Sequence, residues 1–341
     1  MGRTAMLLVL GLGVALGLIG FQINRSAAIA TNTQYAYLKY MNARNLARTA
    51  VHAMLRAYDR GDSSITQTDF GGGTFRLVGL PQHSGDTIRL VTEGSYADST
   101  YTMRVTLFKT TAGFPTVKAA MAIRATPIDF TTKGPPVVDG HNYNLAGTGT
   151  VGFGDVPGVA TMTQSDRDMI ATEPTIYGSP PVVVDSSIID PLKYIDVFKS
   201  NADRRFDTPG THGVGVSNPP WGTTAQPIIT YCNAGDNPAF DIKFSGNIDG
   251  CGILVVRGNV TFTGNFNFKG LVIVEGFSST VSFSANGTPE ILGGVIIAGT
   301  NAKIDLRGAG SNGKVLYSSA ALDKARNIGK LKYYTILDWF E

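Results

Sequence analysis

The sequence predicts an α+β protein built from a long N-terminal helix, an antiparallel β meander and a C-terminal parallel β-solenoid (β-helix). Three observations predict it. Residues 23–58 contain neither proline nor glycine, residues 61–130 alternate apolar and polar side chains, and the C-terminal part repeats a glycine-led apolar motif. We therefore expect a helix over 1–60, an antiparallel sheet over 61–130 and a solenoid over 131–341.

The composition excludes several classes of protein. Aromatic residues make up 9% of the chain, which excludes wholesale disorder, and the 41 glycines lack the period of three found in collagen. A net charge of +3 is too small to indicate a nucleic-acid partner, and we expect none. Residues 1–60 hold seven basic side chains and one acidic one, whereas the remainder holds 22 and 25. The first sixty residues are therefore a distinct region.

The start of the predicted helix is suited to a membrane. No charged residue lies between Arg3 and Arg25, and about 20 apolar residues span a bilayer core. A secretory signal peptide, with cleavage near Ala27–Ala30, is the alternative. Its apolar stretch is usually about 7–15 residues long, and here helical patterning continues past the run. We therefore favour a transmembrane anchor.

The second part of this helix is amphipathic. Apolar side chains recur every three or four residues, through Ala43, Ala47, Met54 and Tyr58, which makes one stripe on a helix. Residues 60–64 then carry the signals that end it. Residues 3–58 are thus expected to form a single helix of roughly 80 Å.

This layout resembles the type IV pilin superfamily, through the apolar run after Gly2-Arg3, the amphipathic second half and the helix length. The resemblance implies an inner-membrane anchor that later packs into a filament core and carries a globular head. It departs from the family pattern because no acidic residue precedes Asp59 and the run lacks proline. We expect prepilin peptidase either to cleave after Gly2 or to have acted already. The expected core residues of the filament are Met6, Leu7, Leu10, Val14, Leu18 and Phe21.

The middle of the chain reads as short strands. Residues 74–78, 87–92 and 101–108 alternate at period two and are separated by glycine-containing turns, which predicts an antiparallel meander. Residues 131–230 are less regular, with short helices expected near 165–170 and 189–198.

The C-terminal repeat predicts the solenoid. Apolar strands follow Gly252, Gly270, Gly294 and Gly313 at offsets of 18, 24 and 19 residues, so each coil would bury its inner face against its neighbours. This region resembles the solenoid head of pilus-assembly proteins with a minor-pilin-like N-terminus. The aromatic-rich residues 333–340 are expected to cover the end of the solenoid, with a subunit contact as the alternative.

The sequence offers few residues for chemistry. An exported location permits a disulfide, so we expect Cys232 to bridge Cys251, with two buried free thiols as the alternative. A metal site would need more ligands than these cysteines and His212, and we expect no metal, no cofactor and no catalytic residue. Asp139-Gly-His141 is interpreted as a turn rather than an acid/base pair.

We therefore predict a non-enzymatic structural subunit of a type IV pilus-like extracellular filament, displayed at the cell surface. It would polymerise through its N-terminal helix after leaving the inner membrane, with type IV pilus or type II secretion-like machinery as partner. Two alternatives stay open. One is a minor pilin or pseudopilin at a filament tip, acting in priming, adhesion or secretion. The other is a membrane-anchored β-helix protein that binds or cleaves polysaccharide.

Overall fold

The computed structural model describes residues 2–59, 67–111, 113–133, 136–212, 221–233, 241–283, 288–307 and 313–340. The chain divides into two compact units. The first holds residues 1–110 together with 333–341, and the second holds 111–332. The sequence analysis placed the corresponding boundary at residue 130. The residues from 60 to 64, which carry the predicted helix stop, lie outside the described residues.

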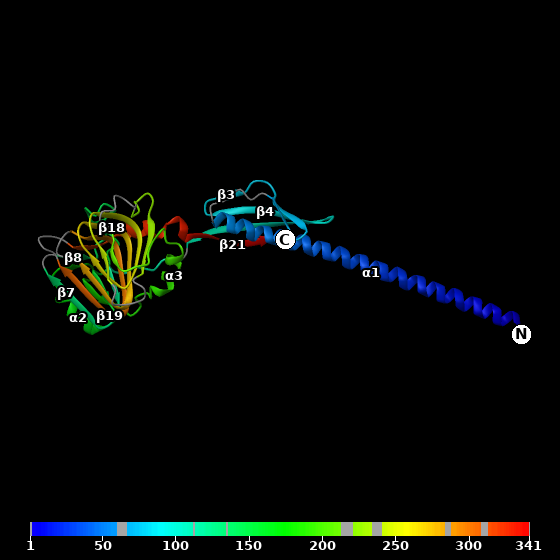
Figure 1. The fold of residues 1–341 in the computed structure, drawn as a ribbon, viewed down its shortest axis with the longest axis horizontal. Helices are drawn as coiled ribbons and strands as arrows, with labels where there is room; N and C mark the ends of the chain where they lie inside the picture. The colour runs from blue at the N-terminus through cyan, green and yellow to red at the C-terminus, as the bar shows by residue number, and fades with distance from the viewer. Residues whose placement is uncertain are drawn as a thin grey trace. The chain divides into compact units, whose positions relative to one another are not determined.

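The first unit begins with one uninterrupted helix, α1 (Gly2–Asp59), as the sequence predicts (Figure 1). Side chains from Met6 to Leu38 are exposed, whereas Ala43, Ala47 and Ala50 are completely buried. The change occurs because only the second half of α1 packs on a sheet. Its last residue is held in place by the chain's other end, since the carboxylate of Asp59 accepts a hydrogen bond from the backbone N–H of Tyr334 at 2.7 Å.

The sheet of this unit is the predicted meander with an added C-terminal strand. Its path is β1-β2-β4-β5-β21, with β3 beside β4, and the pairs among β1 to β5 are antiparallel. The expectation that residues 333–340 cover the end of the solenoid is wrong, because they form a strand of this sheet, next to β5. The strands are β1 (Gln67–Phe70), β2 (Gly73–Leu77), β3 (Gln82–Ser84), β4 (Thr87–Tyr96), β5 (Ser99–Thr111) and β21 (Lys332–Phe340).

One face of this sheet and one stripe of α1 form the core of the first unit. Every second side chain of β4 and β5 points to the helix, which is the period-two pattern of a half-buried strand. The helix approaches closely at Gly94, where a Cβ would lie 2.2 Å from the carbonyl oxygen of Ala43. The buried apolar residues of this core are Ala47, Val51, Met54, Ile88, Leu90, Met103, Val105 and Leu107.

The second unit is a curled parallel sheet with three short helices and a 3-10 turn. Fifteen strands among its described residues belong to that sheet. The strands are β6 (Met121–Arg124), β7 (Ile128–Lys133), β8 (Val137–Asp139), β9 (Val159–Thr161), β10 (Ile176–Tyr177), β11 (Val182–Val184), β12 (Arg204–Phe206), β13 (Gly210–His212), β14 (Ile228–Asn233), β15 (Asp241–Phe244), β16 (Ile248–Arg257), β17 (Asn259–Phe262), β18 (Phe266–Phe283), β19 (Glu290–Arg307) and β20 (Lys314–Tyr317). The helices are α2 (Gln164–Ile170), α3 (Leu192–Ser200), α4 (Ser319–Arg326) and η1 (Gly329–Leu331).

The spatial order of these strands differs from their order in the chain. The main path is β10-β8-β20-β19-β18-β16-β14-β12, and each neighbouring pair along it is parallel. The first strand, β6, lies between β19 and β9, so the chain enters the sheet in its middle. After β11 the chain passes through α3 to the far end at β12 and then builds back to β20. Crossing seven strand spacings covers about 34 Å, which the 19 residues from Asp185 to Asp203 can span.

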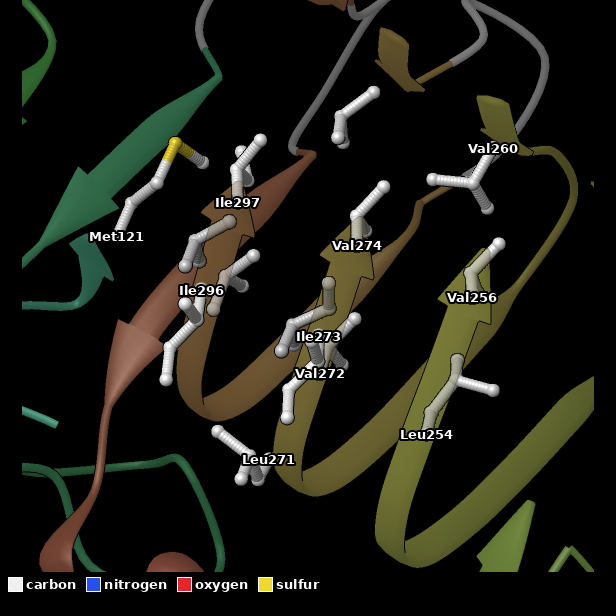
Figure 2. Packing of buried hydrophobic residues seen from close by; sticks show 14 of the residues in the cluster. Met121, Leu254, Val256, Val260, Leu271, Val272, Ile273, Val274, Ile296 and Ile297 are labelled. Atoms are coloured by element: carbon white, nitrogen blue, oxygen red, sulfur yellow. The ribbon is translucent and has the colours of Figure 1, made fainter. Parts of the chain in front are cut away.

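Glycines form a corner shared by three neighbouring strands. Gly252 lies opposite Gly270, and Gly270 lies opposite Gly293. Their φ angles of +136°, +131° and +145° belong to a region that other residues rarely adopt. A Cβ on Gly270 would also lie only 2.0 Å from the carbonyl oxygen of Gly252. Figure 2 shows the curved segments that carry Leu254, Val272 and Ile296 side by side.

This register corrects the predicted repeat by one residue. Gly294, which the sequence analysis aligned with Gly270, lies opposite Leu271, and Gly293 takes the corner. The neighbouring glycines made either alignment possible. Gly294 serves packing instead, because a Cβ there would lie 2.5 Å from the side chain of Val117. The successive offsets are thus 18 and 23 residues.

Candidate functional sites

The N-terminal half of α1 is a large exposed apolar surface. Each of the six predicted filament-core side chains is 59–71% exposed in the isolated chain. Apolar residues surround the helix rather than forming one stripe, which is the pattern of a helix that is covered on all sides. Among the described residues, α1 is the one helix long and apolar enough to cross a membrane. Those six side chains are Met6, Leu7, Leu10, Val14, Leu18 and Phe21.

Small residues make one face of this segment narrow. Gly13, Gly17 and Gly20 are spaced at four and three residues, which places them on the same side of the helix. A Cβ at any of them would meet no atom within 4 Å. Such a face lets the backbone of a second helix approach closely, and in lipid close packing is a main source of helix association.

The two cysteines are free thiols, so the predicted disulfide is wrong. Cys232 on β14 lies opposite Val256 of β16, whereas Cys251 lies at the other end of β16, before the glycine corner. The four residues from Gly252 to Val256 span about 13 Å, and a disulfide needs Cα atoms within roughly 7 Å. Burial raises the pKa of both thiols, that of Cys251 to about 11, so both are neutral and poorly reactive at neutral pH.

The Asp139–His141 turn is more elaborate than the sequence indicated. The buried carboxylate of Asp139 lies 2.6 Å from His141 Nδ1 and accepts the backbone N–H of His141 at 2.9 Å. It also accepts the hydroxyl of Tyr143 at 2.8 Å. Burial, followed by the hydrogen bond to Asp139, raises the pKa of Tyr143 to about 12. The carboxylate thus orients a half-exposed imidazole, which is an arrangement able to move a proton.

The sequence singled out Asp139 and His141 but missed Tyr143, because the tyrosine joins the turn only through its fold. It leaves β8 two residues after His141 and bends back toward the carboxylate. Within the residues described, no group of three or more His, Cys, Asp or Glu side chains is placed to hold a metal ion.

No protein-family model and no curated protein matches this sequence. Among solved structures, the chain is similar to the crystal structure of the competence-associated pilin ComZ from Thermus thermophilus, with 10% identity and a TM-score of 0.23. The match covers 89% of this chain and 96% of that one. A TM-score this low describes only a loose resemblance, so function has to be argued from the residues of this chain.

Proposed function

We propose that the protein is a structural subunit of a type IV pilus-like filament. The apolar half of α1 anchors it in the inner membrane and then packs against copies of itself in the filament core. The observation that carries the proposal is the division of one helix into two surfaces. Twelve large apolar side chains from Met6 to Ile23 are 55–73% exposed, while the helix is built into a folded sheet from Ala43 onward.

The size of that exposed surface explains why it needs a partner. Fully burying one such side chain contributes about 1.5–3 kcal/mol. Covering twelve of them, each roughly 60% exposed, is therefore worth on the order of 15 kcal/mol. This equals or exceeds the total stability of a typical domain, about 5–15 kcal/mol. Lipid can cover this surface before assembly, and neighbouring helices can replace lipid afterwards.

We interpret the second unit as a β-solenoid head displayed on the outside of the filament. Three features support this interpretation: the parallel pairing along the main path, the offsets of 18 and 23 residues, and the corner shared by Gly252, Gly270 and Gly293. Assembly would require inner-membrane machinery of the type IV pilus or type II secretion kind. The protein would then be at the cell surface.

The experiment compares two leucine-to-lysine variants in the natural host. Leu10→Lys puts a charge in the middle of the apolar run, which costs about 3 kcal/mol in a membrane-spanning helix. Leu80→Lys is the matched control, because Leu80 is 93% exposed in the first unit and lies outside α1. We expect filaments sheared from cells to contain the wild type and Leu80→Lys but not Leu10→Lys, as seen by immunoblot and electron microscopy.

The position of the protein in those filaments distinguishes the candidate subunit roles. Finding it at every repeat supports the major-subunit proposal, whereas a single copy at the tip identifies a minor pilin. Filaments that still contain Leu10→Lys at wild-type level would contradict the packing argument.

A second candidate function follows from the oriented imidazole at His141. Asp139 holds this ring as a carboxylate holds a general base, which favours a membrane-anchored protein that cleaves polysaccharide. Depolymerisation of a glycan by the wild type but not by His141→Ala, in cells that form no filament with this chain, would establish this alternative.

A further inference from the structure

One end of the curled sheet buries polar atoms that have no hydrogen-bond partner. Strand β12 ends the main path, and β13 and β14 lie close to it in the fold. Among the described residues of these three strands, four buried side-chain atoms are unpaired: Arg204 Nη1, His212 Nε2, Thr230 Oγ1 and Tyr231 Oη. Unpaired buried atoms are rare in native proteins, and an ion or an ordered water usually accounts for them.

Strand register separates three of these residues from the fourth. Arg204 pairs with Thr230, and Arg205 pairs with Tyr231. Paired residues of parallel strands point to the same face and successive residues to opposite faces. Arg204 and Thr230 thus share one face, while Tyr231 lies on the other, where Lys199 and Arg205 stack on its ring.

Aromatic rings hold the polar groups of the first face together. The guanidinium of Arg204 lies 5.3 Å from the ring centre of Phe206 and 4.7 Å from that of Trp221. The ring of His212 lies 4.2 Å from that of Phe206. Arg204 and His212 therefore meet around one phenylalanine, and Thr230 lies on the strand beside it.

The positive charge of Arg204 has no counter-charge in the part of the chain that the structure describes. The nearest carboxylates along the chain are used elsewhere, since Asp203 pairs with Lys330 at 2.5 Å and Asp207 with Arg205 at 3.0 Å. The thiol of Cys232 is neutral, because burial raises its pKa. Burial also lowers the pKa of Arg204, which reflects the cost of holding this charge away from water.

We propose that Arg204, Thr230 and His212 form a binding site for a small oxyanion, above all a carboxylate, seated against Phe206 and Trp221. A guanidinium offers two parallel N–H donors to a carboxylate, and the threonine hydroxyl and His212 Nε2 can supply further hydrogen bonds. The anion would neutralise the buried charge and satisfy the three unpaired atoms together. This binding activity goes beyond the filament role and does not depend on it.

Trp221 provides a direct readout of the site. The chain has two tryptophans, Trp221 and Trp339, so Trp339→Phe in the full-length protein leaves Trp221 as the only one. This protein, in detergent, is titrated with sodium acetate, sodium phosphate and sodium chloride at constant ionic strength. We expect Trp221 emission to change with saturation for at least one oxyanion and not for chloride. Acetate alone indicates a carboxylate site, and phosphate alone an inorganic oxyanion.

Variants locate the response. Arg204→Gln should weaken oxyanion binding by about tenfold or more, because it removes the charged donor. Thr230→Val keeps the side-chain shape and should weaken binding several-fold, and it decides the matter if Arg204→Gln does not fold. Arg205→Gln is the matched control on the opposite face and should bind normally. An unsaturable response, an equal response to chloride, or unchanged binding in Arg204→Gln and Thr230→Val would overturn the proposal and leave ordered water as the explanation.

Discussion

Replacing Gly270 by alanine tests whether the glycine corner holds the second unit together. Gly270 has a φ of +131°, and its Cβ would lie 2.0 Å from the carbonyl oxygen of Gly252, where real Cβ contacts stay beyond 3.0 Å. The neighbouring Gly293 packs as closely on Gly270. The alanine must therefore separate two strands by about 1 Å and adopt a backbone conformation that costs about 1–3 kcal/mol. Weakened ladder hydrogen bonds add about 1 kcal/mol each, for a total near 4 kcal/mol.

Thermal unfolding followed by Trp221 fluorescence measures this effect, because Trp221 is buried in the second unit. At about 2–4 °C per kcal/mol for a unit of this size, Gly270→Ala should lower the Tm by roughly 8–16 °C. The control is Gly329→Ala in the same unit, where a Cβ meets nothing within 4 Å and φ is not positive. It should shift the Tm by no more than about 2 °C. A Tm for Gly270→Ala within 2 °C of the wild type, or equal losses in the two variants, would refute the reasoning.

Three further predictions concern the two cores and the buried titratable groups. Met54→Ala in the helix–sheet core should destabilise the first unit by about 2–5 kcal/mol in denaturant unfolding, since Met54 is 2% exposed; a loss below 0.5 kcal/mol would contradict the packing. Iodoacetamide should alkylate Cys251 about a hundredfold more slowly than an ordinary thiol at pH 8 in the folded protein, because burial raises its pKa from 9.0 to about 11; equal rates before and after unfolding, by mass spectrometry, would refute this. Burial, with repulsion from Arg204, lowers the pKa of His212 below 6.5, so the unfolded chain takes up the proton first. Stability should therefore be constant above about pH 7 and fall as the pH drops below 6.5. His212→Gln should lose less stability between pH 7 and 5 than the wild type, and equal losses would exclude His212 as the source.

The filament proposal links two properties that a soluble domain would not combine. The exposed half of α1 needs lipid or other helices, and the buried half holds the sheet on which β21 lies. Because Asp59 accepts a hydrogen bond from Tyr334, the end of the anchor helix is tied to the chain's last strand. A force on the helix would therefore reach the sheet directly through backbone contacts.

Elements encoded in a short stretch of sequence could be predicted well. Helix α1 was expected over 3–58 and occupies Gly2–Asp59, because its propensities and its apolar spacing agree within every turn. Strands β2, β4 and β5 were expected near 74–78, 87–92 and 101–108, since alternation at period two is a local property.

The errors all involve partners far apart in the chain. The expected disulfide joined residues 19 apart in sequence, but the register of β14 on β16 holds them at opposite ends of a strand. The repeat alignment failed by one residue at Gly293 and Gly294, because a sequence with two adjacent glycines does not show which one stands at the corner. The C-terminal strand was assigned to the solenoid, although it belongs to the sheet of the first unit.

The sequence by itself determined the division of this chain into an apolar helix, a meander and a parallel repeat, because hydrophobic periodicity acts over a few residues and needs no knowledge of the fold. Only the tertiary structure decided the strand order that places β6 beside β19, and the return of β21 to β5. It also decided the unpaired polar atoms of Arg204, His212 and Thr230. The physical reason is that a strand's edge can pair with many others, and the choice depends on which register buries the most apolar surface and satisfies the most hydrogen bonds across the whole unit.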